Sequence, residues 1–161
     1  MRLHDSLKGW FVEGALAMLA CLATAAPASG QQLDLSVNPA NVSFGSADPD
    51  TTPIVVAPPT VVTIRVRGLS GGGTWRLTVL ADGDLIAGPA AVDISNVTWT
   101  ATPSPPFQNG TLSRTVPQTM AAGTGNVPQP LNGSVVFRLV NSWNHAAGVY
   151  TQTFVLTLSA P

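Results

Sequence analysis

The chain has 161 residues, of which 45% are hydrophobic and only 9% are charged, and its formal net charge is −1. A chain of this length is expected to form one domain with a sizeable core. So sparse and balanced a charge excludes the strongly basic surface by which proteins bind nucleic acid or an anionic membrane.

Residues 1–30 have the features of a secretory signal peptide. Basic residues precede an apolar segment from 15 to 26, and small residues follow it. The apolar segment is too short for a typical membrane span, so an uncleaved anchor is the weaker alternative. We expect cleavage after Ala28 or Gly30, which leaves residues 31–161 as a single exported domain.

The only cysteine, Cys21, lies inside this leader. Met18 and Leu19 stand where bacterial lipoprotein signals usually have leucine and a small residue, so the sequence does not favour an acylated cysteine. The exported chain therefore has no disulfide to use, and its stability must come from its core.

The residues after the leader contain no lysine and no glutamate, and threonine, serine and asparagine supply most of the polar surface. This composition favours strands, and we expect essentially no helix. The first strand is predicted at 33–37, as an edge strand that ends before Pro39. Alternation of apolar and polar residues predicts further strands at 61–67, 75–80 and 93–101.

Two connections are predicted from turn chemistry. Asp82-Gly83 between apolar runs predicts a hairpin from the strand at 75–80 into Leu85-Ile86. The stretch 102–133 contains six prolines and little periodicity, so it is expected to meander over the surface, with a strand only at 111–116.

The last part of the chain, residues 134–161, is predicted to form a long β-hairpin. Its second arm alternates strictly, with Tyr150, Phe154 and Leu158 on one face and threonines and Val155 on the other. Such a strand pair needs a second sheet to cover its apolar face.

Together these elements predict an all-β fold, an immunoglobulin-like β-sandwich of about seven to nine antiparallel strands, with a barrel as the main alternative. The predicted core consists of the inward-facing residues of these strands: Val62, Ile64, Val66, Trp75, Leu77, Val79, Trp99, Val135, Phe137, Leu139, Tyr150, Phe154, Leu156 and Leu158.

Two motifs carry a resemblance to a known group of proteins. One is Trp75-Arg76-Leu77, and the other is Gly148-Val149-Tyr150 leading into the Thr-rich final strand. With these motifs the chain resembles the WxL-like and pilin-like β-domains of bacterial surfaces. The resemblance implies a noncatalytic protein that is structural or adhesive, and it supplies no site residue beyond Trp75, Leu77, Gly148 and Tyr150.

The sequence offers no constellation for catalysis or for a cofactor. His145 is the only histidine after the leader, and no Gly-x-Ser-x-Gly motif accompanies it. One histidine without cysteine cannot complete a zinc shell. The pairs Asp48/Asp50 and Asp82/Asp84 would offer oxygen ligands to calcium if their loops met, although turn formation explains both more simply.

Trp143 and His145 are candidate contacts for a glycan, because they lie in a polar loop and a flat indole ring packs well on the apolar face of a sugar. The alternative for Trp143 is a ring folded back over the end of the sandwich. Tyr150 is predicted to act like a tyrosine corner, with its hydroxyl bonded to a nearby backbone group.

The sequence thus leads to two hypotheses for an exported, noncatalytic protein. The first is a structural or assembly subunit of a bacterial surface or appendage, which contacts itself or other surface proteins through an edge strand. The second is a module that binds cell-wall polymer or another glycan.

Overall fold

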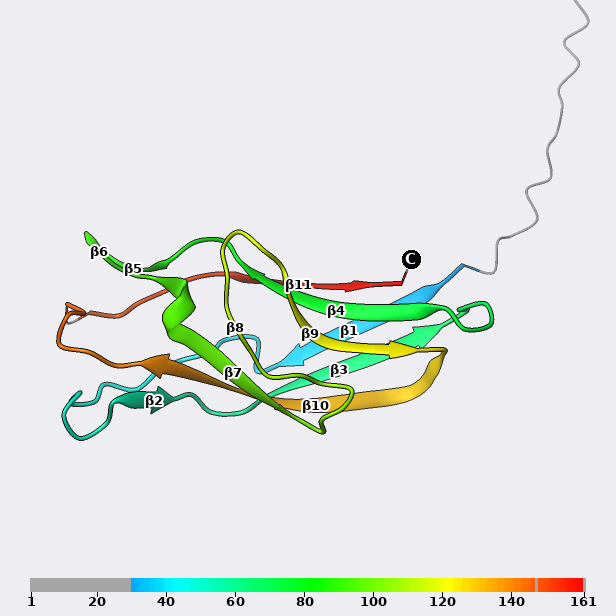
Figure 1. Cartoon of the computed structure of the whole chain (residues 1–161), viewed down its shortest axis with the longest axis horizontal. Helices are drawn as coiled ribbons and strands as arrows, with labels where there is room; N and C mark the ends of the chain where they lie inside the picture. Colours follow the sequence, from blue (N-terminus) through cyan, green and yellow to red (C-terminus); the bar gives the residue numbers. More distant parts are fainter. Residues whose placement is uncertain (1–29, 147, 161) are drawn as a thin grey trace, which may run out of the picture.

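The computed structural model describes residues 30–146 and 148–160, so the predicted signal peptide and Cys21 lie outside the described residues. The described residues form an all-β fold with no α-helix (Figure 1). None of their elements is a helix long and apolar enough to span a membrane. The strands are β1 (Gln32–Asn38), β2 (Ile54–Val56), β3 (Thr60–Arg67), β4 (Thr74–Ala81), β5 (Leu85–Ala87), β6 (Ala90–Val92), β7 (Val97–Thr102), β8 (Gly110–Thr111), β9 (Gln118–Thr124), β10 (Val127–Val140) and β11 (Phe154–Ser159), with one 3₁₀ turn, η1 (Ile94–Asn96), before β7.

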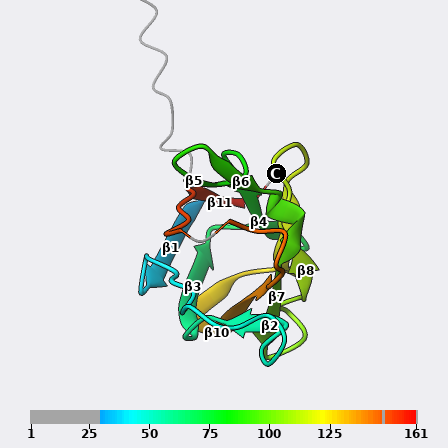
Figure 2. The ribbon, with the colours of Figure 1, turned by 90° about the vertical axis from the view of Figure 1, so that its left-hand side faces the viewer.

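Two antiparallel sheets face each other in a sandwich-like arrangement, which is clearest along the long axis of the molecule (Figure 2). The larger sheet has the order β1-β3-β10-β7-β8, and β2 pairs with the end of β10. The smaller sheet has the order β11-β4-β9, and β5 and β6 form a separate hairpin.

The inner faces of the two sheets form the core. In β3 and β4, buried residues alternate with exposed or half-buried ones over eight residues each. This alternation fits a strand, whose successive side chains point to opposite faces of the sheet. The predicted core is confirmed: Val62, Ile64, Val66, Trp75, Leu77, Val79, Trp99, Val135 and Phe137 are buried, and Leu139, Tyr150, Phe154, Leu156 and Leu158 pack against them while partly exposed.

The predicted terminal hairpin is wrong. Both of its arms are strands, but β10 lies in the larger sheet and β11 pairs with β4 in the smaller one. The described residues between β10 and β11, 141–146 and 148–153, therefore connect two different sheets instead of forming a hairpin turn. Alternation predicted each strand correctly, but it does not specify the strand beside which each one lies.

The hairpin predicted at Asp82-Gly83 is also wrong. β4 is a central strand, bonded to β11 on one edge and to β9 on the other. No edge is left for the residues after Gly83, and β5 pairs with β6 instead.

The stretch 102–133 is not a surface loop. It contains β8, β9 and the first part of β10, and it buries Phe107, Leu112 and Met120 completely or almost so. Phe107 bridges to Ala121 of β9, and the N–H of Leu112 donates to the carbonyl of Val97 in β7. The segment 106–113 therefore passes from one sheet to the other and closes this side of the sandwich.

Candidate functional site

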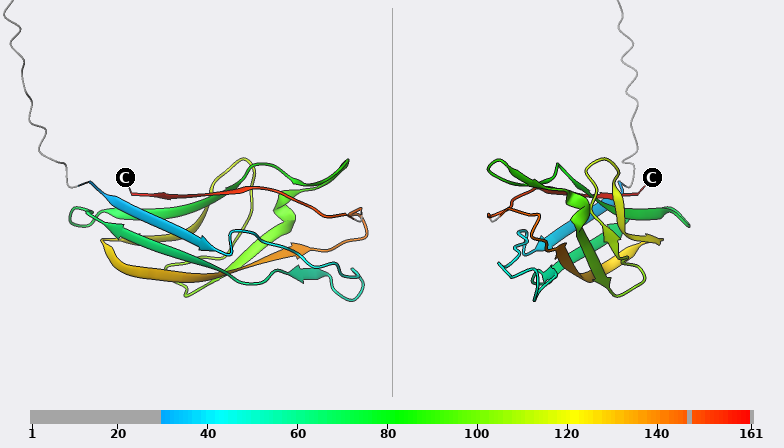
Figure 3. Two further views of the ribbon diagram at one scale, coloured as in Figure 1. Left: turned by 180° about the vertical axis from the view of Figure 1, so that it is seen from behind. Right: turned by 60° about the vertical axis from the view of Figure 1, so that its left-hand side comes forward.

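On the opposite side of the sandwich no described strand bonds the two sheets together. This side is bordered by β1 and β11, the edge strands of the two sheets, which bond only to β3 and β4 respectively among the described strands. The two strands lie closest where β1 begins and β11 ends, and they diverge from there (Figures 2 and 3). We call this side the open seam and define it by the half-buried side chains that face inward from its two strands: Leu33, Leu35, Phe154, Leu156 and Leu158.

The register between β11 and β4 determines which backbone N–H and C=O groups of β11 have no partner in β4. The N–H of Asp82 donates to the carbonyl of Thr153, which makes these two residues a hydrogen-bonded pair next to β11. Hydrogen-bonded and non-bonded pairs alternate along an antiparallel ladder. Leu156 is therefore in a non-bonded pair with Val79, and its N–H and C=O point to the open seam. The same holds for Phe154 and Leu158.

A second feature lies at the end of the molecule opposite the start of β1 and the end of β11 (Figure 1). Trp143 has 69% of its surface exposed, in contrast to 3% for Trp75 and 1% for Trp99. Its indole Nε1–H donates to Oδ1 of Asp50 at 2.9 Å. The ring is thus held at its polar edge and is not folded back over the core. We call Trp143 and Asp50 the tip platform.

The turn that carries Asp50 is fastened to the end of β10 by Asn141. The Asn141 side-chain amide donates to the carbonyls of Ala47 and Thr52, each at 3.0 Å, and its backbone N–H donates to the carbonyl of Pro53 at 2.9 Å. Asn141 is a positioning residue that the sequence did not single out, since one asparagine after a strand carries no distinctive signal.

The other candidate glycan contact, His145, is half-buried and does not stand beside Trp143 as a second exposed ring. Its backbone N–H donates to the carbonyl of Ser142 at 3.0 Å, which tightens the loop. Tyr150 behaves as predicted, since its hydroxyl donates to the carbonyl of Ala146 at 2.8 Å. Gly148 packs against Ala87, where a Cβ would lie 2.9 Å from the alanine methyl.

The two aspartate pairs serve separate turns. Asp48 accepts from the N–H of Asp50, whereas Asp84 accepts from Nη1 of Arg114 at 2.6 Å and from the N–H of Ile94. In the part of the chain that the structure describes, no three histidine, cysteine or acidic side chains gather as a metal site would require. The carboxylates of Asp48, Asp50 and Asp84 thus each have a hydrogen-bond partner within the fold.

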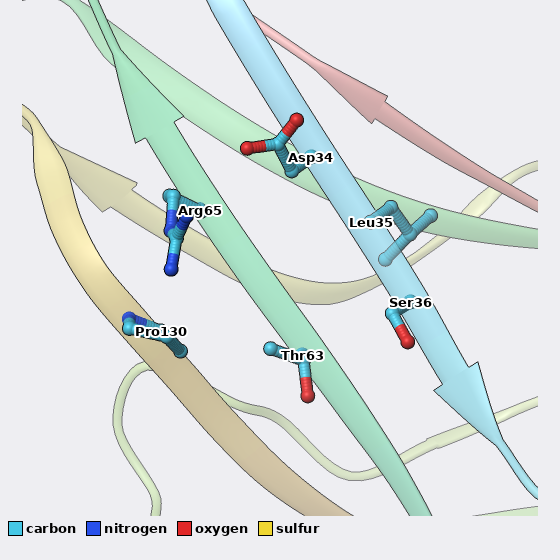
Figure 4. Close-up of a pocket in the computed structure, with 6 residues that line it drawn as sticks. All are labelled: Asp34, Leu35, Ser36, Thr63, Arg65 and Pro130. Carbon is cyan, nitrogen blue, oxygen red and sulfur yellow. The ribbon is translucent and has the colours of Figure 1, made fainter.

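Two shallow hollows lie on the outer surface. One, of about 230 Å³, is lined by Asp34 and Ser36 of β1, by Thr63 and Arg65 of β3, and by Pro130 (Figure 4). The other, of about 460 Å³, lies beside η1 and includes Asp93 and Ser95. Hydrogen bonds from the Ser95 hydroxyl and then from its backbone N–H lower the pKa of Asp93. This carboxylate caps η1, and neither hollow contains an aromatic ring.

Comparison with known proteins gives no family: no family model matches the chain, and no curated protein is significantly similar to it. The motif residues Trp75 and Leu77 are both buried in β4, so they are core residues rather than surface contacts. The open seam and the tip platform are accordingly the two surfaces from which a function can be argued.

Proposed function

We propose that the protein is a secreted, noncatalytic assembly subunit of a bacterial surface layer or appendage, which binds its neighbour by β-strand addition at the open seam. The observation that supports this proposal is the outer edge of β11, to which no described strand bonds and beside which apolar side chains are only half-buried.

An immunoglobulin-like sandwich has strands A, B, E and D in one sheet and C, F and G in the other. Here β1, β3, β10 and β7 follow one another as A, B, E and D do, with β8 added beyond β7 and β2 at the end of β10. β4 and β11 are paired as C and F are, while β9 adds to the far edge of β4. The G position would lie against the free edge of β11, which is the open seam, and no described residue pairs there.

A strand from a neighbouring subunit would satisfy two needs at this place. Its backbone would bond to the N–H and C=O groups that Phe154, Leu156 and Leu158 direct to the free edge. Its alternate side chains would cover the apolar residues of the open seam, which are only half-buried in the single chain. Main-chain bonds supply affinity in this mode of binding, and side-chain pockets supply specificity. Export by the predicted signal peptide would bring the subunit to the surface where it assembles.

The test compares two substitutions of one residue by sedimentation velocity of the mature protein over a wide concentration range. Leu156→Pro removes the N–H that points to the seam and leaves the bonds to β4 in place, whereas Leu156→Ala shortens the side chain even more and keeps that N–H. We expect the wild type and Leu156→Ala to form oligomers and Leu156→Pro to remain a monomer. Circular dichroism checks that both variants are folded.

A wild type that stays monomeric at high concentration would overturn assembly with its own copies. Equal oligomerisation of the two folded variants would show that association occurs elsewhere on the surface.

A further inference from the structure

The tip platform presents the only well-exposed tryptophan among the described residues. A single exposed aliphatic side chain is common and needs no explanation. A large indole ring that is 69% exposed and anchored by a hydrogen bond is different, because the bond holds the ring in place while most of its surface stays accessible.

The platform is organised before any ligand arrives. Asp50, which holds the ring, is placed by the bond from its own N–H to Oδ1 of Asp48 at 2.9 Å. The carbonyl of Asp48 accepts from the N–H groups of Thr51 and Thr52, which closes the turn, and Asn141 ties the turn to β10. A ring already held in position loses little conformational freedom on binding.

The chemistry around the ring selects the class of ligand. Nucleic-acid bases also stack on exposed aromatic rings, but such sites line positively charged grooves. Here the side chain that holds the ring is the carboxylate of Asp50, and the only ion pair in the described residues joins Arg114 to Asp84 in a different turn. Carboxylates repel anionic polymers and accept hydrogen bonds from sugar hydroxyls.

From these observations we infer that the tip platform is a binding site for a neutral polysaccharide. A pyranose ring stacks its C–H face on the indole of Trp143, and a hydroxyl at the edge of the sugar donates to Oδ2 of Asp50, whose Oδ1 holds the ring. The site is separate from the open seam, so one subunit can bind a neighbour and a glycan at the same time.

Affinity electrophoresis and tryptophan fluorescence of the purified protein test this inference. The probes are cellohexaose and chitohexaose, which are neutral, and polygalacturonate, which is anionic. We expect saturable binding of at least one neutral probe with a change in tryptophan emission, because the other two tryptophans of the domain are buried.

Three variants locate the site. Trp143→Ala should weaken binding of the neutral probe at least about tenfold, the loss expected when a contact of roughly 1.4 kcal/mol is removed. Asp50→Ala should weaken it less, because the ring remains but is no longer held. Val149→Ala is the matched control, since Val149 is an exposed apolar residue of the same connection, at 86%, and it should bind as the wild type does.

Several results would overturn the inference. They are no saturable binding of either neutral probe, binding of polygalacturonate alone, and neutral binding that Trp143→Ala leaves unchanged. Because Trp143 and Asp50 lie in surface turns, we expect both variants to keep the wild-type circular dichroism spectrum. Oligomerisation through the open seam is measured independently, so either proposal can fail while the other holds.

Discussion

Three large aromatic rings lie directly over glycines of neighbouring segments. Trp75 covers Gly123 and Trp99 covers Gly110, and in each case the two residues are paired directly on neighbouring strands. Phe107 covers Gly133 of β10. None of these glycines has a positive φ. They are needed for space, since the ring fills the volume that a Cβ would occupy.

Gly123→Ala tests this packing at a single residue. The added Cβ would lie 2.6 Å from Cζ2 of Trp75, and both groups are held by the sheet. Overpacking of this kind destabilises proteins by about 1–3 kcal/mol, and we expect a loss of that size in urea denaturation. Gly71→Ala, where nothing lies within 4 Å, is the control and should stay within about 0.5 kcal/mol of the wild type. Equal stability of the two variants would contradict the role given to the ring.

Among the elements, strands with regular alternation were predictable and their partners were not. β3 and β4 alternate over eight residues, and they appear where the pattern placed them. β10 and β11 alternate too, yet the predicted hairpin between them does not exist. Alternation of apolar and polar residues indicates which face of a strand is buried. It contains no information on the neighbouring strand, which is decided by packing over the whole core.

The segment 102–133 escaped prediction for a different physical reason. Its prolines interrupt the alternation, but Phe107, Leu112 and Met120 still point into the core from short strands and turns. Burial here depends on contacts with distant strands, such as the bond from the N–H of Gln108 to the carbonyl of Met120. A local pattern cannot show contacts of this kind.

Phe107→Ala measures how much the segment 102–133 contributes to the stability of the fold. Phe107 is fully buried, and truncation of such a phenylalanine typically costs about 3–5 kcal/mol. We expect a loss of that size in chemical denaturation. Val116→Ala, in the same segment but 56% exposed, should change stability by less than about 0.5 kcal/mol. A surface loop would instead tolerate both substitutions equally.

The candidate sites, too, were predictable from the sequence only in part. Trp143 was identified from its polar loop, and the structure shows it exposed. Its anchor Asp50 lies 93 positions away in sequence, and Asn141 bonds to residues 94 and 89 positions away, so only the fold could reveal them. The open seam likewise depends on which edge strands the fold brings together.

The molecule as a whole is asymmetric. On one side the segment 106–113 bonds to both sheets and closes the sandwich. On the other side the free edges of β1 and β11 leave apolar side chains half-buried. Unpaired strand edges are usually protected in soluble proteins, because they pair readily with other chains. An unprotected edge beside an incompletely covered core is therefore the natural place for a partner.

This asymmetry predicts that thermal stability depends on concentration. If subunits add strands to one another at the open seam, association stabilises the folded state by mass action, and the apparent Tm rises with protein concentration. The rise should be present in Leu156→Ala, although from a lower starting Tm, since the loss of its side chain weakens the core. It should be absent in Leu156→Pro, in which the seam can no longer form a continuous ladder. Differential scanning calorimetry at several concentrations measures all three proteins. A Tm independent of concentration in the wild type would mean that the seam stays open in solution, and equal slopes in the two variants would place the association on another surface.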